Sequence, residues 1–258
     1  MSKFVRTLFC TCCALSAPAW GQLTDTTIAT NRVTVPASTA ASWTDILVTC
    51  PSGLVALSGA LDSNNFNSIE VTTLAPTFGG AALTFQPDGV RGPADGWYAS
   101  VKNYDSVARP VALAVVCASL SDVVVSVSSG AVTAGSTSVP GTGGAVANCP
   151  SGYSSTGGGI DLALPASMKV SALGPLFGFQ YLIDRPAGMG AAPSGWSGNA
   201  RNEGGAGSMK VAAVCTQLGG VSTIVTGAFT IGAGVAAGYS AACPAGNIAL
   251  GGGIDTND

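Results

Sequence analysis

The sequence predicts an all-β protein that consists of tandem, disulfide-stapled modules of the β-sandwich or jelly-roll-like kind. Three observations lead to this prediction: the composition, a motif that occurs three times, and cysteines that recur with the motif. Together they favour many short strands joined by tight turns over helices or disorder.

The composition is that of a folded β protein with very few charges. Apolar residues make up 47% of the 258 residues and charged residues only 9%, whereas disordered chains combine low hydrophobicity with high charge. Thr and Val occur together with 36 Gly and 14 Pro, which suits short strands and tight turns. No stretch shows the long apolar period of an amphipathic helix.

Residues 1–21 have the features of a secretory signal peptide. Lys3 and Arg6 precede an apolar run, and cleavage is expected after Ala19 or Gly21. The three cysteines of this segment follow no lipobox, so we expect them to leave with the signal. The prediction is an exported protein, secreted or held at the cell surface, in an oxidising compartment.

One motif organises the rest of the chain, because it occurs three times. It begins with Cys-Pro-x-Gly and ends with Asp, and the second copy follows the first at a constant offset of 99 residues, the third following at 94. The connections are short, so neighbouring modules are expected to touch and form a semi-rigid rod. The predicted organisation is a signal peptide at 1–21, β modules at 22–120 and 121–219, and a partial third repeat at 220–258.

The partial third repeat lacks the tryptophan and the second cysteine of a complete module. We expect it to be truncated, with a capping role as the alternative, and its unpaired strand edges predict self-association. The uncharged stretch at 221–243 is long enough to cross a bilayer. Its counterparts at 28–50 and 127–149 contain proline, and tandem copies should share a fold, so no membrane span is predicted.

The cysteines that follow the signal recur at matched positions. Cys50 and Cys117 are 67 residues apart, and Cys149 and Cys215 are 66 apart. We expect one disulfide within each complete module, because a zinc site would need closely spaced cysteines or histidines. Cys243 is left without a partner.

Charge and residue usage bear on the function classes. The net charge of −3, without a basic cluster, argues against nucleic acid as a partner. The chain contains no His, which is the commonest general base and metal ligand. We therefore expect no enzyme, no metal site and no cofactor, with a glycoside hydrolase that uses paired carboxylates as a distant alternative.

Two sets of recurring residues are the candidate ligand-binding positions. The first set has two interpretations: an exposed indole that stacks on a sugar while an amide binds hydroxyls, or a core indole with a turn-forming amide. The second set is interpreted as a structural turn cap or as a Ca²⁺ ligand. Arg91, Tyr98 and Tyr104 lie near the first copy only, so if one copy binds more strongly, it should be the first. The first set is Trp97, Trp196, Asn103 and Asn202, and the second is Asp62 and Asp161, with Asp255 as its third copy.

The order Cys-Pro-x-Gly, Gly-Gly-Gly, Pro, Gly-Trp, Asn, Val-Cys resembles modules of uncharacterised exported bacterial proteins and of the ends of some tail-fibre-like or collagen-like chains. The first copy departs from it, with Ser58-Gly59-Ala60 in place of three glycines. The resemblance implies an extracellular or surface setting and brings no catalytic residues. We expect a secreted or surface-exposed repeat protein with a structural, adhesive or partner-recognition role, whose partner is a glycan or a surface protein. A carbohydrate-binding module is the alternative.

Overall fold

The computed structural model shows an all-β protein, as the sequence predicts. The structure describes residues 23–37, 43–63, 68–163, 167–178, 180–181, 187–225, 241–245 and 247–253. Within these residues the only helical element is a single 3-10 turn, η1, at Leu83–Phe85. The predicted signal peptide lies outside the described residues.

Module 1, the described part of residues 23–120, is a sandwich of two three-stranded antiparallel sheets. One sheet has the strand order β1-β7-β3, and the other has the order β2-β6-β4. A short arm, β5, follows η1. The strands are β1 (Thr24–Val35), β2 (Thr44–Thr49), β3 (Val55–Ser63), β4 (Ile69–Thr77), β5 (Gly89–Arg91), β6 (Gly96–Asn103) and β7 (Arg109–Ser119).

Module 2, the described part of residues 121–219, repeats this arrangement strand for strand. Its sheets have the orders β8-β14-β10 and β11-β13-β9, and its short arm is β12. The strands are β8 (Val124–Val132), β9 (Gly141–Asn148), β10 (Ser154–Leu162), β11 (Met168–Leu176), β12 (Gly188–Gly190), β13 (Gly195–Asn202) and β14 (Gly207–Thr216).

The strands form because their side chains alternate between the core and the outside. In β7, Val111, Leu113, Val115 and Cys117 are buried, whereas the residues between them are only half-buried. Each module closes its sandwich with the predicted disulfide, Cys50–Cys117 in module 1 and Cys149–Cys215 in module 2. Each disulfide joins the segment after the second strand to the last strand.

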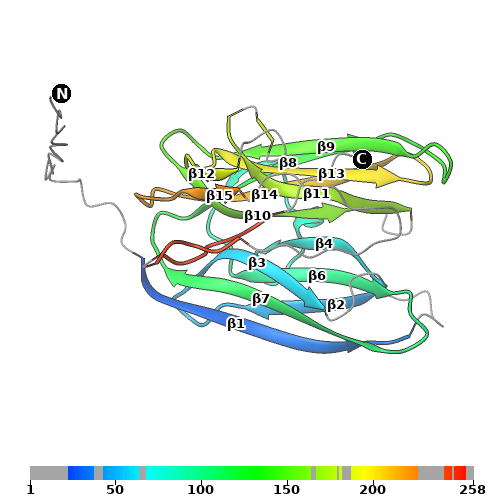
Figure 1. The fold of residues 1–258 in the computed structure, drawn as a ribbon, viewed down its shortest axis with the longest axis horizontal. Coiled ribbons are helices and arrows are strands. Elements are labelled where there is room, and N and C mark those ends of the chain that lie inside the picture. The colour runs from blue at the N-terminus through cyan, green and yellow to red at the C-terminus, as the bar shows by residue number, and fades with distance from the viewer. Residues whose placement is uncertain are drawn as a thin grey trace, which may run out of the picture.

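The two modules lie side by side and share one sheet, which differs from the expected rod (Figure 1). β4 of module 1 pairs with β10 of module 2, and β5 of module 1 pairs with β8, which gives the strand order β2-β6-β4-β10-β14-β8-β5. Valines on the outer face of β8 pack into the core cluster of module 1. Short connections allow lateral packing as well as stacking, and the apolar outer face of β8 and β14 favours the lateral arrangement.

The described part of the third repeat contacts both modules, because Leu250 packs against the core cluster of module 1. A short strand, β15 (Thr223–Val225), pairs with β12, and residues 247–253 run beside β10 without belonging to a named strand. Cys243 is exposed and has a free thiol. Most of the stretch at 221–243 lies outside the described residues, and no described helix has the length and apolar character needed to cross a membrane.

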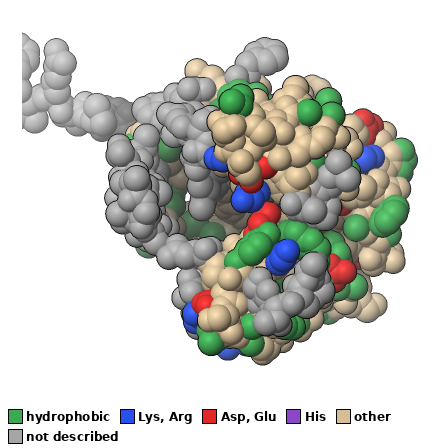
Figure 2. Space-filling view, turned by 90° about the vertical axis from the view of Figure 1, so that its right-hand side faces the viewer, with side chains coloured by type: hydrophobic (Ala, Val, Ile, Leu, Met, Phe, Trp, Pro, Cys, Tyr) green, Lys and Arg blue, Asp and Glu red, His purple; other side chains and the backbone are tan. Residues whose placement is uncertain are grey.

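Charged residues are few, at 9% of the chain. Figure 2 shows one face of the molecule, on which acidic and basic side chains meet in a hollow between two lobes.

Candidate functional site

The two recurring tryptophans lie in the module cores. Trp97 is 0% exposed and Trp196 is 3% exposed. Each indole packs on the middle glycine of its motif, because a Cβ at Gly59 would overlap Trp97 and a Cβ at Gly158 would overlap Trp196. Neither indole offers a face to a ligand, so of the two interpretations the core indole is the one that the structure shows.

The two recurring asparagines are buried and close a turn in each module. The side-chain amide of Asn202 donates to the carbonyl oxygens of Thr133 (2.9 Å) and Gly205 (2.7 Å), and its Oδ1 accepts from the N–H of Gly204 (3.0 Å). Asn103 makes the matching bonds, which include 2.8 Å to the carbonyl oxygen of Val107. These amides satisfy backbone groups inside the module and leave nothing for sugar hydroxyls.

The recurring aspartates have different surroundings. Asp161 is 4% exposed, and its carboxylate accepts hydrogen bonds from Thr73 Oγ1 (2.7 Å), from the N–H of Thr84 (2.6 Å) and from the Thr84 hydroxyl. Both threonines belong to module 1, so Asp161 joins the modules. Asp62 is exposed and lines a shallow recess with Arg32 and Pro110. No cluster of three or more His, Cys, Asp or Glu side chains occurs in the described part of the chain.

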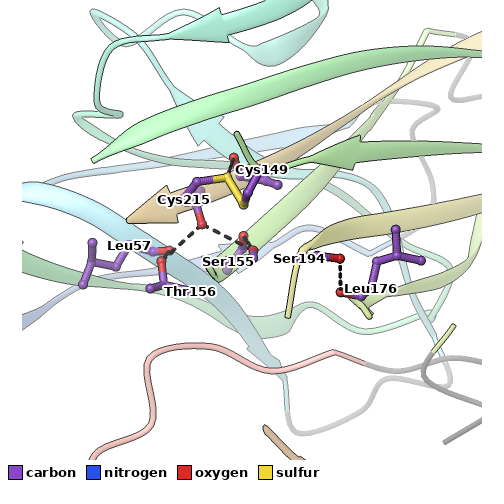
Figure 3. Close-up of a disulfide and its surroundings, with 10 residues drawn as sticks. Leu57, Cys149, Ser155, Thr156, Leu176, Ser194 and Cys215 are labelled. Carbon is purple, nitrogen blue, oxygen red and sulfur yellow. Dashed lines mark hydrogen bonds between the residues drawn. A yellow bond between two sulfur atoms is a disulfide. The ribbon is translucent and has the colours of Figure 1, made fainter. Parts of the chain in front are cut away.

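Polar contacts beside the second disulfide also cross between the modules. Figure 3 shows Ser155 and Thr156 next to the Cys149–Cys215 disulfide. The Thr156 hydroxyl donates to the carbonyl oxygen of Leu57 in module 1, at 3.2 Å. The Ser155 hydroxyl donates to the carbonyl oxygen of Gly157 within β10, at 2.9 Å. The Thr156 bond therefore joins the start of β10 to β3, and Ser155 lies opposite Cys215 in the register of β10 and β14.

A second recess, of about 550 Å³, opens where the modules meet at the starts of β4 and β11. Tyr104 is the most exposed aromatic residue at its mouth, with 51% of its surface exposed. Lys102 Nζ lies 4.8 Å from the centroid of the Tyr104 phenol and 5.9 Å from that of the Trp43 indole. The lining residues are Ser68, Ile69, Glu70, Val71, Tyr104, Lys169 and Val170.

The charges around this recess are partly paired. Desolvation and a hydrogen bond to Glu70 raise the pKa of Tyr104 to about 12, so the phenol is a neutral hydrogen-bonding group at physiological pH. Lys169 Nζ lies 3.8 Å from Glu203 Oε2. The phenol ring of Tyr104 beside an acid and an amine can bind a polar ligand that has an apolar face.

Sequence reasoning found only part of this recess. Tyr104 was noted as a neighbour of the first copy, whereas Glu70 and Lys169 were missed. These two residues lie at equivalent positions, 99 residues apart, and carry opposite charges. A comparison of charges across the repeat offset is the signal that finds them. Of the other two residues noted near the first copy, Tyr98 is half-buried and Arg91 lies over Phe78.

No family model, no curated protein and no solved structure matches this chain.

Proposed function

We propose that the protein is a secreted or surface-exposed repeat protein with a structural, adhesive or partner-recognition role outside the cytoplasm. The supporting features are two disulfides, which persist in oxidising compartments, and the segment with signal-peptide character at residues 1–21.

The observation that carries this proposal is the seven-stranded sheet that crosses the module boundary. Its apolar contacts and the buried Asp161 bonds join the modules into one block. Such a block holds its surface loops in fixed relative positions, which is what an adhesive or scaffold protein requires.

Export is tested with the full chain carrying a C-terminal tag, expressed in a Gram-negative host. We expect the tagged protein in the medium or envelope fraction, with a new N-terminus near residue 20 or 22 and with both disulfides formed on thiol labelling. A variant without residues 2–21 is the control and should stay in the cytosol. A full-length chain that remains cytosolic and reduced contradicts the proposal.

Adhesion is tested by coating beads with the purified mature chain and measuring their retention on immobilised cell-surface proteins and glycans. We expect retention that disappears when the disulfides are reduced and the modules unfold. Equal retention of native and reduced protein would show nonspecific adsorption and would contradict a recognition role.

Carbohydrate binding is the second candidate function, and the exposed Tyr104 phenol at the module junction is the observation that favours it. The site would be this recess and not the buried tryptophans, with Glu70 and Lys169 as the polar groups that face a sugar. The glycoside hydrolase alternative gains no such support among the described residues, because the Asp161 carboxylate is already bound by Thr73 and Thr84.

A glycan array separates this candidate from the first. If the recess binds sugars, Tyr104→Ala should abolish the signal. Phe85→Ala is the matched control, because Phe85 is 81% exposed and does not line the recess. An array on which the folded chain binds nothing, or on which both variants lose binding equally, rejects the carbohydrate candidate.

A further inference from the structure

Three equivalent positions of the repeat meet at one place in the structure: Ser58, Gly157 and Gly251. A Cβ at Gly157 would lie 2.6 Å from the carbonyl oxygen of Leu57 in module 1, and a Cβ at Gly251 would lie 2.5 Å from that of Thr156 in module 2. The Ser58 hydroxyl in turn donates to the carbonyl oxygen of Leu250. The second repeat thus contacts the first, the third contacts the second, and the first contacts the third. In each case the contact is to the residue that precedes the equivalent position. Closure after three contacts is the signature of a pseudo-three-fold axis and not of an open rod.

A second set of contacts repeats in the same way. A Cβ at Gly159 would lie 2.5 Å from Ala75 Cα, and a Cβ at Gly253 would lie 2.5 Å from Gly174 Cα. Ala75 and Gly174 are themselves 99 residues apart. The first and third glycines of the motif therefore face the preceding module, while the middle one faces its own tryptophan.

The short arms repeat the pattern a third time. β5 of module 1 pairs with β8 at the start of module 2, and β12 of module 2 pairs with β15 at the start of the third repeat. The third repeat therefore meets module 2 as module 2 meets module 1. Its described residues occupy the place of the first strands of a third module.

The corresponding face of module 1 is open. Within the described residues, β1 and β3 are both edges of the three-stranded sheet, whereas their counterparts β8 and β10 pair with strands of module 1. Ile28, which pairs with Val116 of β7, is 64% exposed, although Val125, which pairs with the equivalent Val214 of β14, is fully buried. Asp62 is likewise exposed where Asp161 is buried.

This open face is apolar as well as unpaired. Ala114 and Val116 beside Ile28 are half-buried, and their counterparts Ala212 and Val214 are 0% exposed under the neighbouring module. Exposed edges next to an apolar surface are normally covered, because they otherwise pair with other chains.

We propose that the open face of module 1, formed by β1 and β3, is the docking site for the remaining strands of a third module of this repeat, continuous with residues 223–253. The docked module closes a three-module ring. Its short arm pairs with β1 at Ile28–Thr30, as β5 pairs with β8, and its fourth strand lies beside β3, as β4 lies beside β10. The interface continues the two interfaces already present, which is why the occupant is a module of the same kind.

One residue adjusts the fit at this third interface. Ala60 stands where modules 2 and 3 have Gly159 and Gly253, so its methyl group holds the docked module slightly farther from β3. Gly252 has no neighbour within 4 Å among the described residues, although its counterparts Gly59 and Gly158 are covered by indoles. A third module would bring its own tryptophan to this position.

The test is a chain in which residues 256–258 are replaced by residues 162–219, so that the third module is complete. We expect a monomer by sedimentation, an oxidised Cys243 because the added module supplies its disulfide partner, and hydrogen exchange at residues 28–30 slower by about tenfold or more than in the unextended chain. In the extended chain, Ala60→Gly should slow this exchange further. Ala60→Arg should restore fast exchange while leaving the denaturation midpoint of the unextended chain unchanged.

Three outcomes overturn the proposal. The first is a third disulfide that forms while residues 28–30 exchange as fast as before. The second is protection that appears only in oligomers, which makes the occupant a second chain. The third outcome needs a second extended chain, in which residues 63–120 follow Asp255, because the strands of module 2 could fail to fit for reasons of their own. If neither extension forms the third disulfide, the face does not accept a module.

Discussion

The carboxylate of Asp161 in β10 accepts a 2.7 Å hydrogen bond from the hydroxyl of Thr73 in β4. The bond is buried and joins the two modules at the point where their sheets merge. Asp62, the equivalent residue of module 1, is exposed. The same residue of the same motif therefore has two roles, depending on whether a neighbouring module covers it.

Asp161→Ala should lower the free energy of unfolding by about 2 to 3 kcal/mol, because it removes hydrogen bonds to a buried charged group and leaves the Thr73 hydroxyl unpaired. Asp62→Ala is the matched control and should change it by less than about 0.5 kcal/mol. Urea unfolding monitored by tryptophan fluorescence measures both. Equal effects of the two substitutions would show that Asp161 does not couple the modules.

Gly158→Ala should destabilise the protein by about 3 kcal/mol or more, since the added methyl group would overlap the Trp196 indole and lie 2.4 Å from the carbonyl oxygen of Ala212. Gly252→Ala should be nearly neutral, because a Cβ there meets nothing within 4 Å among the described residues. Thermal denaturation compares the two variants. A neutral Gly158→Ala would mean that Trp196 does not pack on this glycine.

Asn202→Ala should cost about 2 to 3 kcal/mol, because the carbonyl oxygens of Thr133 and Gly205 lose their donor inside the module. Asn31→Ala is the control: Asn31 is exposed and makes one bond of 3.2 Å to Leu47, so its loss should cost less than about 0.5 kcal/mol. Chemical denaturation gives both values. A ligand-binding defect with unchanged stability in Asn202→Ala would restore the recognition role predicted for it.

Loss of one disulfide should destabilise its module by about 4 kcal/mol, since each closes a loop of 66 or 67 residues in the unfolded chain. The variant is Cys149→Ser with Cys215→Ser, in a chain that also carries Cys243→Ser to prevent exchange. Cys243→Ser alone should be neutral, because this thiol is exposed and free. If this triple variant unfolds at the same urea concentration as Cys243→Ser alone, the bond constrains neither state.

Stability should fall as the pH rises above about 10. Desolvation and Glu70 raise the pKa of Tyr104 to about 12, whereas a tyrosine of the unfolded chain ionises near 10. Below about pH 10 the Tyr104 phenol keeps its proton in both the folded and the unfolded state. Between about pH 10 and the folded-state pKa of about 12, the unfolded state releases this proton first, so unfolding becomes easier. Burial and Asp45 also raise the pKa of Tyr98.

Tyr104→Phe should therefore reduce the alkaline loss of stability but not remove it. Denaturation midpoints across the alkaline range measure the effect, and ultraviolet absorbance of the phenolate follows the ionisation itself. An unchanged pH profile in Tyr104→Phe would mean that Tyr104 ionises like a free tyrosine.

The local features that repeat could be predicted from the sequence alone. Thr, Val and Gly usage predicts strands, and the matched spacing of Cys50, Cys117, Cys149 and Cys215 predicts the two disulfides, which the structure contains. The repeat offset also shows which residues are equivalent. These properties follow from backbone propensity and from distances along the chain, which a single sequence records.

The differences between equivalent residues arise from the packing of the folded modules. Trp97 packs inward on Gly59, and Asn103 is buried by its bonds to the backbone of its own module. A sequence does not state which face of a strand is covered. Asp161 is buried and Asp62 exposed because a neighbouring module covers one and not the other. Lateral packing about a pseudo-three-fold axis depends on contacts between residues almost 200 positions apart, such as Ser58 with Leu250. Such contacts depend on the shapes of folded surfaces, which local patterns do not encode.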